Sequence, residues 1–326
     1  MKKIIVVFVS LLLCLLVLLI RARKQKDNID TIKLSEVTHS VFYTPLYVAI
    51  ENGYFKEENI NLELTLTPGA DKVASSVLSK DADIGFSGPE ATIYIYNNSK
   101  QKLITFASLT KKDGQFIVGD CIYKNDFDLN DLIGKKVLAG RSAGMPLMMF
   151  QYALKQNNID ENKIKIDTSV EFAGLTGAYI SGQGDFVNLF EPNASKIEDD
   201  NYGCVLASLG NLTPNVPYTT FYAREEYINE HKDLLQRFNN ALNKGIKFTL
   251  DNTEDIIANA ISKQFPDTNT RTLQSLVKRY KEADSWYKNT TINIHDYYNL
   301  IDVMINGKAI DKKPPLELLI TNEFNK

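Results

Sequence analysis

The stretch from Thr44 to Gly88 constrains the fold of this chain more than any other segment. Together with the residues just before it, this stretch predicts strands at 32–37, 61–67 and 83–87, with helices at 44–53 and 70–80. Alternation of strands and helices at this spacing favours a parallel sheet with helices packed on its faces. Ligands of such sheets bind beyond the carboxyl ends of the strands, where loops and helix N-termini meet.

The N-terminus carries an export pattern. Ile4–Ile20 is an uncharged apolar run of 17 residues that follows Lys2 and Lys3. The run is slightly shorter than the roughly 20 residues that span a bilayer. Ile20-Arg21-Ala22 makes a poor cleavage site, and Leu13 before Cys14 makes a poor lipidation site. We expect residues 1–26 to remain as a membrane anchor, with cleavage or lipidation as alternatives, and the rest of the chain to lie outside the cytoplasm.

Charge and cysteine content argue against a nucleic-acid partner and against a cysteine metal site. Residues 1–26 hold six of the 37 basic side chains and no acid, so the other 300 residues carry 31 basic and 40 acidic side chains. A formal charge of −9 argues against nucleic acid as a partner. Cys121 and Cys204 are too far apart in sequence for a metal-binding motif. We expect them to be unpaired and buried, with a disulfide between them as the alternative.

A second α/β pattern begins near residue 113 and predicts a second lobe. It contains strands at 116–118, 136–139, 163–168, 185–189 and 205–209, and helices at 129–132, 146–157 and 174–181. A strand at 218–223 then returns to the first lobe, and helices follow at 231–250, 254–264, 269–283 and 294–305. We therefore expect lobe one to hold residues 32–112 plus 222–326, and lobe two residues 113–221. Two crossing segments would leave a cleft between the lobes, a favoured place for ligands.

The loop before Pro146 is the strongest candidate binding element. Arg141, Ser142, Gly144 and Met145 follow a predicted strand, and Pro146 opens the next helix. Backbone N–H groups at such a helix start favour an anion, and Arg141 suits a sulfonate, carboxylate or phosphate. The alternative is an ordinary strand-to-helix turn with a surface arginine.

Two strand ends of lobe one supply further candidates. His39, Phe42 and Tyr43 follow the first strand, where the aromatic rings offer a stacking surface. We expect His39 to form hydrogen bonds rather than bind a metal or act as a base. Ser87 ends the third strand, and Glu90 lies in the first turn of the next helix, either as a ligand contact or as a carboxylate favoured by the helix dipole.

Strand ends of lobe two and the returning segment complete the predicted site. Glu171 and Glu191 each follow a strand, and Tyr218 lies where the chain returns to lobe one. For Glu191, which precedes Pro192, simple turn chemistry is the alternative to a ligand contact. The predicted site includes no metal and no cofactor.

Several segments, in this order, resemble the solute-binding proteins of ABC importers, namely TPLYVAIENGYFKEENINLELTLT, DADIGFSG, DLIGKK and GQGDFVNLFEP. The resemblance is to the branch that handles alkanesulfonates, taurine and thiamine pyrimidine precursors. It implies a type II periplasmic-binding-protein-like fold with two α/β lobes, two hinge crossings and a helical C-terminal part. It also implies a receptor that delivers a small organic molecule, either sulfonate-like or a precursor pyrimidine, to an ABC permease.

Two other classes of function remain as alternatives. One branch of the resembled family makes the pyrimidine half of thiamine with a cysteine-rich iron motif and a histidine that donates nitrogen. This chain has no cysteine cluster, and three histidines with scattered acids do not suggest a catalytic arrangement. We therefore expect a binding protein rather than an enzyme. A membrane-anchored ligand sensor that serves no importer is the second alternative.

Overall fold

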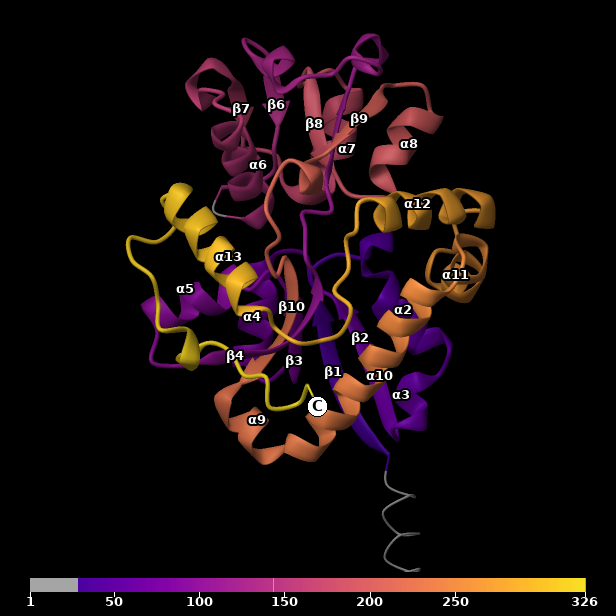
Figure 1. The fold of residues 1–326 in the computed structure, drawn as a ribbon, viewed down its shortest axis with the longest axis vertical. Coiled ribbons are helices and arrows are strands. Elements are labelled where there is room, and N and C mark those ends of the chain that lie inside the picture. Colours follow the sequence, from indigo (N-terminus) through magenta and orange to yellow (C-terminus); the bar gives the residue numbers. More distant parts are fainter. Residues whose placement is uncertain (1–28, 143, 326) are drawn as a thin grey trace, which may run out of the picture.

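The computed structural model describes residues 29–142 and 144–325, so the predicted anchor, residues 1–26, lies outside the described residues. Two five-stranded sheets organise this part of the chain, one in each of two lobes (Figure 1). The two-lobed α/β fold with two hinge crossings and a helical C-terminal part is thus confirmed. No helix among residues 29–142 and 144–325 is long and apolar enough to cross a bilayer.

The sheet of lobe one is mostly parallel and receives one strand from late in the sequence. In spatial order its strands are β2 (Ile60–Leu66), β1 (Asp30–Glu36), β3 (Ile84–Ser87), β10 (Thr219–Arg224) and β4 (Leu103–Thr110). β1 pairs in parallel with β2 and β3, whereas β10 runs antiparallel to β3 and β4. The predicted boundary at residue 222 falls inside β10.

The sheet of lobe two repeats this arrangement. Its strands, in spatial order, are β7 (Lys165–Asp167), β6 (Lys136–Leu138), β8 (Phe186–Leu189), β5 (Phe116–Gly119) and β9 (Cys204–Ser208). Here β6 is parallel to β7 and β8, and β5 is antiparallel to β8 and β9. In both sheets the fourth strand directly follows a crossing between the lobes, so the two crossings connect equivalent places.

Helices cover both sheets. Lobe one has α2 (Thr44–Glu51), α3 (Tyr54–Glu57), α4 (Ala70–Leu78), α5 (Glu90–Asn98), α9 (Glu225–Glu230), α10 (Lys232–Asp251), α11 (Glu254–Ile261), α12 (Thr270–Glu282) and α13 (Ile294–Asn306). Lobe two has α6 (Met145–Gln156), α7 (Leu175–Ile180) and α8 (Asn193–Asp199). Short 3-10 turns include η1 (Val41–Tyr43), η2 (Cys121–Tyr123), η3 (Leu129–Leu132), η4 (Glu161–Lys163), η5 (Phe172–Gly174), η6 (Leu209–Asn211), η7 (Ser262–Gln264) and η8 (Leu316–Leu318).

Two C-terminal helices reach across to lobe two. In Figure 1, α12 lies beside α8 on one side of the junction and α13 lies beside α6 on the other. Arg279 of α12 is 3.5 Å from the Glu198 carboxylate of α8, and Lys155 of α6 donates to Asn306 of α13. The helical C-terminal part therefore supports the junction from both flanks.

Aromatic side chains fill the centre of the junction. Phe42 is completely buried, and its ring centroid lies 5.6 Å from that of Phe190 and 5.1 Å from that of Tyr280. Tyr218, in the returning segment, meets Phe42 edge-on at 5.8 Å. Because these rings come from both lobes, one hydrophobic core continues through the crossing region.

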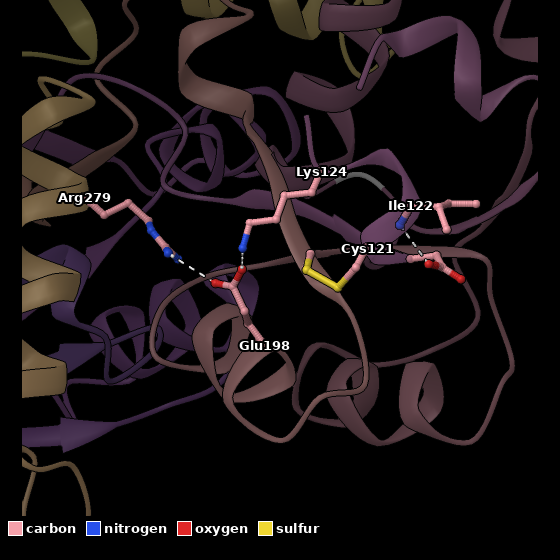
Figure 2. The surroundings of a disulfide bond; sticks show 7 residues. Cys121, Ile122, Lys124, Glu198 and Arg279 are labelled. Atoms are coloured by element: carbon pink, nitrogen blue, oxygen red, sulfur yellow. Dashed lines mark hydrogen bonds and ion pairs between the residues drawn. A yellow bond between two sulfur atoms is a disulfide. The ribbon is translucent and has the colours of Figure 1, made fainter. Parts of the chain in front are cut away.

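Cys121 and Cys204 form a disulfide, so the expectation of unpaired thiols is wrong (Figure 2). Strand pairing explains why two residues 83 positions apart meet. β5 lies beside β9 with Gly119 opposite Cys204, which places Cys121 just beyond the end of the ladder. The disulfide thus ties η2 to the edge strand of lobe two.

Candidate ligand-binding site

A cavity of about 450 Å³ lies between the lobes, within the size range of small-molecule sites. Lobe one contributes the segments that follow β1, β2 and β3, and lobe two contributes the loop between β6 and α6. The lining residues include the aromatic side chains of Tyr43, Tyr94, Phe172, Phe190 and Tyr218. A site with walls from both lobes is suited to a ligand that both lobes contact at once.

Seven of the twelve predicted site residues line this cavity. They are Tyr43, Glu90, Arg141, Ser142, Gly144, Met145 and Tyr218. Each follows the end of a strand or lies in the returning segment, which is where ligands of α/β sheets bind. The structure therefore brings the predicted strand ends of the two lobes together around one space.

His39 lies outside the cavity and belongs to the packing of lobe one. Its Nδ1 is 2.8 Å from the Glu36 carboxylate, and its Nε2 is 2.9 Å from the Gln264 carbonyl. The ring also packs against Tyr47 and Phe265, at centroid distances of 4.7 and 5.0 Å. These contacts give His39 a hydrogen-bonding role between η1 and the C-terminal helices.

Phe42 and Ser87 lie beneath the cavity rather than on its surface. Phe42 is the centre of the buried aromatic cluster described above. Ser87 is fully buried, and its hydroxyl is 2.8 Å from the hydroxyl of Tyr222 in the neighbouring strand β10. Both residues support cavity-lining neighbours, since Tyr43 and Gly88 follow them directly in the chain.

The two glutamates of lobe two also lie outside the cavity. Glu171 is exposed at the start of η5, where its charge raises the pKa of Arg141 after the larger effect of Asp71. Glu191 is buried with an ion pair to Arg279 and accepts from the Ser195 amide at 2.8 Å and the Ser195 hydroxyl at 3.0 Å. Its neighbour Phe190 lines the cavity instead.

Asp71 is the main lining residue that sequence reasoning missed. It lies in the first turn of α4, after the loop that follows β2, at the same sheet edge as the predicted strand ends. Gly69 in this loop has a φ of 116°, a conformation that glycine adopts without strain. The sequence signal was this glycine followed by an acid in the first helical turn, a pattern equally typical of a helix start.

Asp71 and Arg141 form an ion pair that joins the two lobes at the cavity. The hydrogen bond that Arg141 donates to the Asp71 carboxylate raises the pKa of Arg141. Partial burial favours protonated Asp71, but the hydrogen bond and charge of Arg141, with two backbone amides, outweigh it and lower the pKa of Asp71. Both groups are therefore charged at neutral pH, and the guanidinium already has an anionic partner.

Glu90 places a buried carboxylate in the wall of the cavity. The residue is 3% exposed, and its Oε2 has no hydrogen-bond partner among the described residues. Burial raises the pKa of Glu90 to about 7, although its own backbone amide, the amide of Met145 and the charge of Arg141 act in the opposite direction. A Cβ at Gly88 would lie 2.0 Å from Oε2, so only glycine leaves room for this carboxylate.

Two α/β lobes around a shared cavity define the class of periplasmic-binding-protein folds. The chain belongs to the NMT1/THI5-like family, whose model matches residues 41–256. It is 35% identical to a chain of Bacillus subtilis (strain 168) named as a binding protein, YtlA, over 305 residues that cover 93% of this chain and 91% of that one.

Solved structures show the same fold at low sequence identity. The alkanesulfonate-binding protein SsuA from Xanthomonas axonopodis pv. citri, bound to MOPS, matches with a TM-score of 0.72 and 12% identity over 90% of this chain and 99% of that one. The periplasmic nitrate-binding protein NrtA from Synechocystis PCC 6803 matches with a TM-score of 0.67 and 13% identity, over 91% of this chain and 87% of that one. The Bacillus subtilis relative at 35% identity is named as a binding protein, so the interpretation as a binding protein rather than an enzyme is confirmed.

Proposed function

We propose that this chain is the extracytoplasmic solute-binding receptor of an ABC importer and captures a small organic solute between its lobes. The cavity of about 450 Å³ carries this proposal, because both lobes and five aromatic side chains contribute to its wall. Sulfonates and thiamine-precursor pyrimidines are the solute classes to test first, since neighbours of this fold include sulfonate-binding proteins.

Hinge closure is the proposed mechanism of capture. The division of the chain at the two crossings lets one lobe rotate against the other, as in hinged binding proteins. A ligand held by both lobes stabilises the closed arrangement because it has fewer contacts in the open one. Arg141 and Met145 of lobe two would then complete a site that Tyr43 and Glu90 of lobe one begin.

An extracytoplasmic location and a permease partner complete the proposal. The disulfide between Cys121 and Cys204 supports export, since structural disulfides persist mainly in oxidising compartments. The apolar run Ile4–Ile20 would hold the receptor at the membrane surface next to its permease. Closure over the solute would provide the signal that the permease recognises.

Small-angle scattering with a panel of solutes tests the receptor function. Sulfonates, thiamine-precursor pyrimidines and related heterocycles are first screened by thermal shift, and each stabilising compound is then tested for compaction. We expect at least one compound to raise the melting temperature and reduce the radius of gyration. Tight binding without compaction would contradict hinge closure, and the absence of binding by every compound would contradict the receptor function.

A further inference from the structure

We infer that the cavity selects a ligand with a cationic nitrogen on a flat apolar body and disfavours an anionic one. This inference rests on the proposed receptor function and narrows its ligand to one charge class. It follows from the arrangement of three charged residues in the wall, Asp71, Glu90 and Arg141. Among the described lining residues, these three are the charged ones.

The arginine that would attract an anion is surrounded by carboxylates. Asp71 forms an ion pair with Arg141 across the cavity, and the charges of Glu171 and Glu90 also act on the guanidinium. An anionic ligand at Arg141 must displace Asp71 and approach the remaining carboxylates. The cost of this repulsion offsets the gain from a new charge-assisted hydrogen bond.

The helix start that would bind an anion also faces a protein carboxylate. Met145 begins α6, and its backbone amide acts on the carboxyl of Glu90 in lobe one, whose pKa it lowers. A helix N-terminus attracts negative charge through such free N–H groups and through its dipole. Here Glu90 already supplies that charge, so the favourable position for a ligand anion is occupied from within the chain.

Glu90 itself provides the complementary feature for a cation. Its Oε2 is buried and lacks a hydrogen-bond partner among the described residues, although buried carboxylate oxygens normally have one. A ligand N–H donor would satisfy this oxygen, and a positive charge would offset its desolvation. Tyr43, Phe172 and Phe190 in the same wall suit a flat apolar body next to the charged group.

Two probes with the same ring and opposite charge test the inference. Benzamidine is a cation and benzenesulfonate an anion, and calorimetry at pH 8 compares their affinities for the purified protein. We expect benzamidine to bind at least about tenfold more tightly than benzenesulfonate. Replacing Glu90→Gln should weaken benzamidine by about tenfold or more, the scale of a hydrogen bond to a charged group.

Two further variants test whether the difference in affinity between the two probes arises in the cavity. Asp71→Asn frees Arg141 and should raise the affinity for benzenesulfonate, which the ion pair suppresses in the wild type. Glu63→Gln, at an exposed position of β2 outside the lining of the cavity, removes one carboxylate and should leave both affinities unchanged. An equal loss of benzamidine affinity in Glu63→Gln would show a general charge effect and overturn the inference.

The pH dependence of benzamidine binding gives a second readout. The charged and titratable groups whose electrostatics couple to Glu90 are Tyr43, Tyr94, Tyr218, Tyr222 and Tyr297, together with Arg141 and Asp71. The tyrosines stay neutral and the ion pair stays charged between pH 6 and 8, whereas Glu90 ionises. Benzamidine affinity should therefore rise about tenfold over this range.

The Glu90→Gln variant should lose most of this rise. Asp113, whose pKa burial also raises to about 7 and which contacts Tyr218, remains in the variant and accounts for any small residual slope. An undiminished slope would overturn the role of Glu90. Compaction of the protein with benzenesulfonate but not with benzamidine would overturn the inference and leave the receptor function standing. If neither the two probes nor any panel compound binds, both the inference and the receptor function are overturned.

Discussion

Among single residues, His39 shows how a histidine near a ligand cavity can serve stability instead. Glu36 and the Gln264 carbonyl are both acceptors, so both ring nitrogens must donate, and only the imidazolium does this. Burial lowers the pKa of His39, but the hydrogen bond and charge of Glu36 and the carbonyl of Gln264 outweigh it and raise the pKa. The charged form of His39 thus belongs to the folded state.

We predict that His39→Gln destabilises the protein more at pH 6 than at pH 8.5. A raised pKa gives stability that is present below the ordinary value of 6.5 and lost as pH rises through the folded-state value. Near pH 6 the substitution should lower the unfolding free energy by about 1 kcal/mol, because the His39 side chain is partly exposed. Urea unfolding at the two pH values measures it, with exposed His295→Gln as the control.

Glu90 predicts a related pH dependence for the free protein. Burial raises its pKa to about 7 from 4.5, so the stability that it contributes is full below pH 4.5 and lost as pH rises through 7. The unfolding free energy that Glu90 contributes changes by on the order of 3 kcal/mol at most between the two pKa values. Glu90→Gln should flatten the fall in unfolding free energy between pH 5 and 8, leaving the parts due to Asp113 and His39. A fall as steep as in the wild type would contradict this.

Among the structural elements, the disulfide between η2 and β9 is a constraint on lobe two. It closes a long loop of the unfolded chain, so its removal should lower the unfolding free energy by about 2–4 kcal/mol. Urea unfolding with and without reductant measures the loss. A Cys121→Ser/Cys204→Ser double variant should match the reduced protein and show no response to reductant. Sensitivity to reductant in that variant would locate the effect elsewhere.

Elements with a strong local pattern could be predicted from the sequence. The spacing of Leu235, Phe238, Leu242 and Ile246 predicts α10, and these side chains form its buried face. Short amphipathic segments such as α8 have too few apolar residues to stand out, and this helix was missed. Its absence from the prediction also hid the partner of Glu191, because the Ser195 amide and hydroxyl that bind the carboxylate belong to α8.

Contacts that depend on tertiary pairing could not be predicted. The meeting of Cys121 with Cys204 follows from the register of β5 against β9, which no local pattern specifies. The position of Asp71 opposite Arg141 depends on how the lobes face each other. Seven cavity-lining residues could be predicted because parallel strands end at a common edge, whereas the direction of each side chain there depends on its packing.

At the scale of the whole molecule, ion pairs of α12 join the two lobes on one flank. Arg279 pairs with Glu191, whose side chain is fully buried, and lies 3.5 Å from Glu198, which also accepts from Lys124 at 2.7 Å (Figure 2). A buried carboxylate that loses its cation is strongly destabilising. This contact therefore contributes to holding the lobes together on the flank of α12.

We predict that Arg279→Ala lowers the unfolding free energy by about 3 kcal/mol and raises the radius of gyration of the free protein. Lys155→Ala, on the opposite flank at Asn306, removes an exposed contact and should cost less than about 0.5 kcal/mol. Urea unfolding and small-angle scattering measure both variants. Equal effects of the two would show that Arg279 has no special part in holding the lobes together.

The position of Trp286 gives the molecule an internal optical reporter. It is the one tryptophan in the chain, is 2% exposed, and donates from its indole nitrogen to the Phe42 carbonyl at 2.7 Å. Its ring lies 6.3 Å from Tyr280, within the aromatic cluster between the lobes. Because no other indole contributes, a change in indole fluorescence on adding a solute would come from this junction. Rotation of the lobes could then be followed in real time without any attached dye.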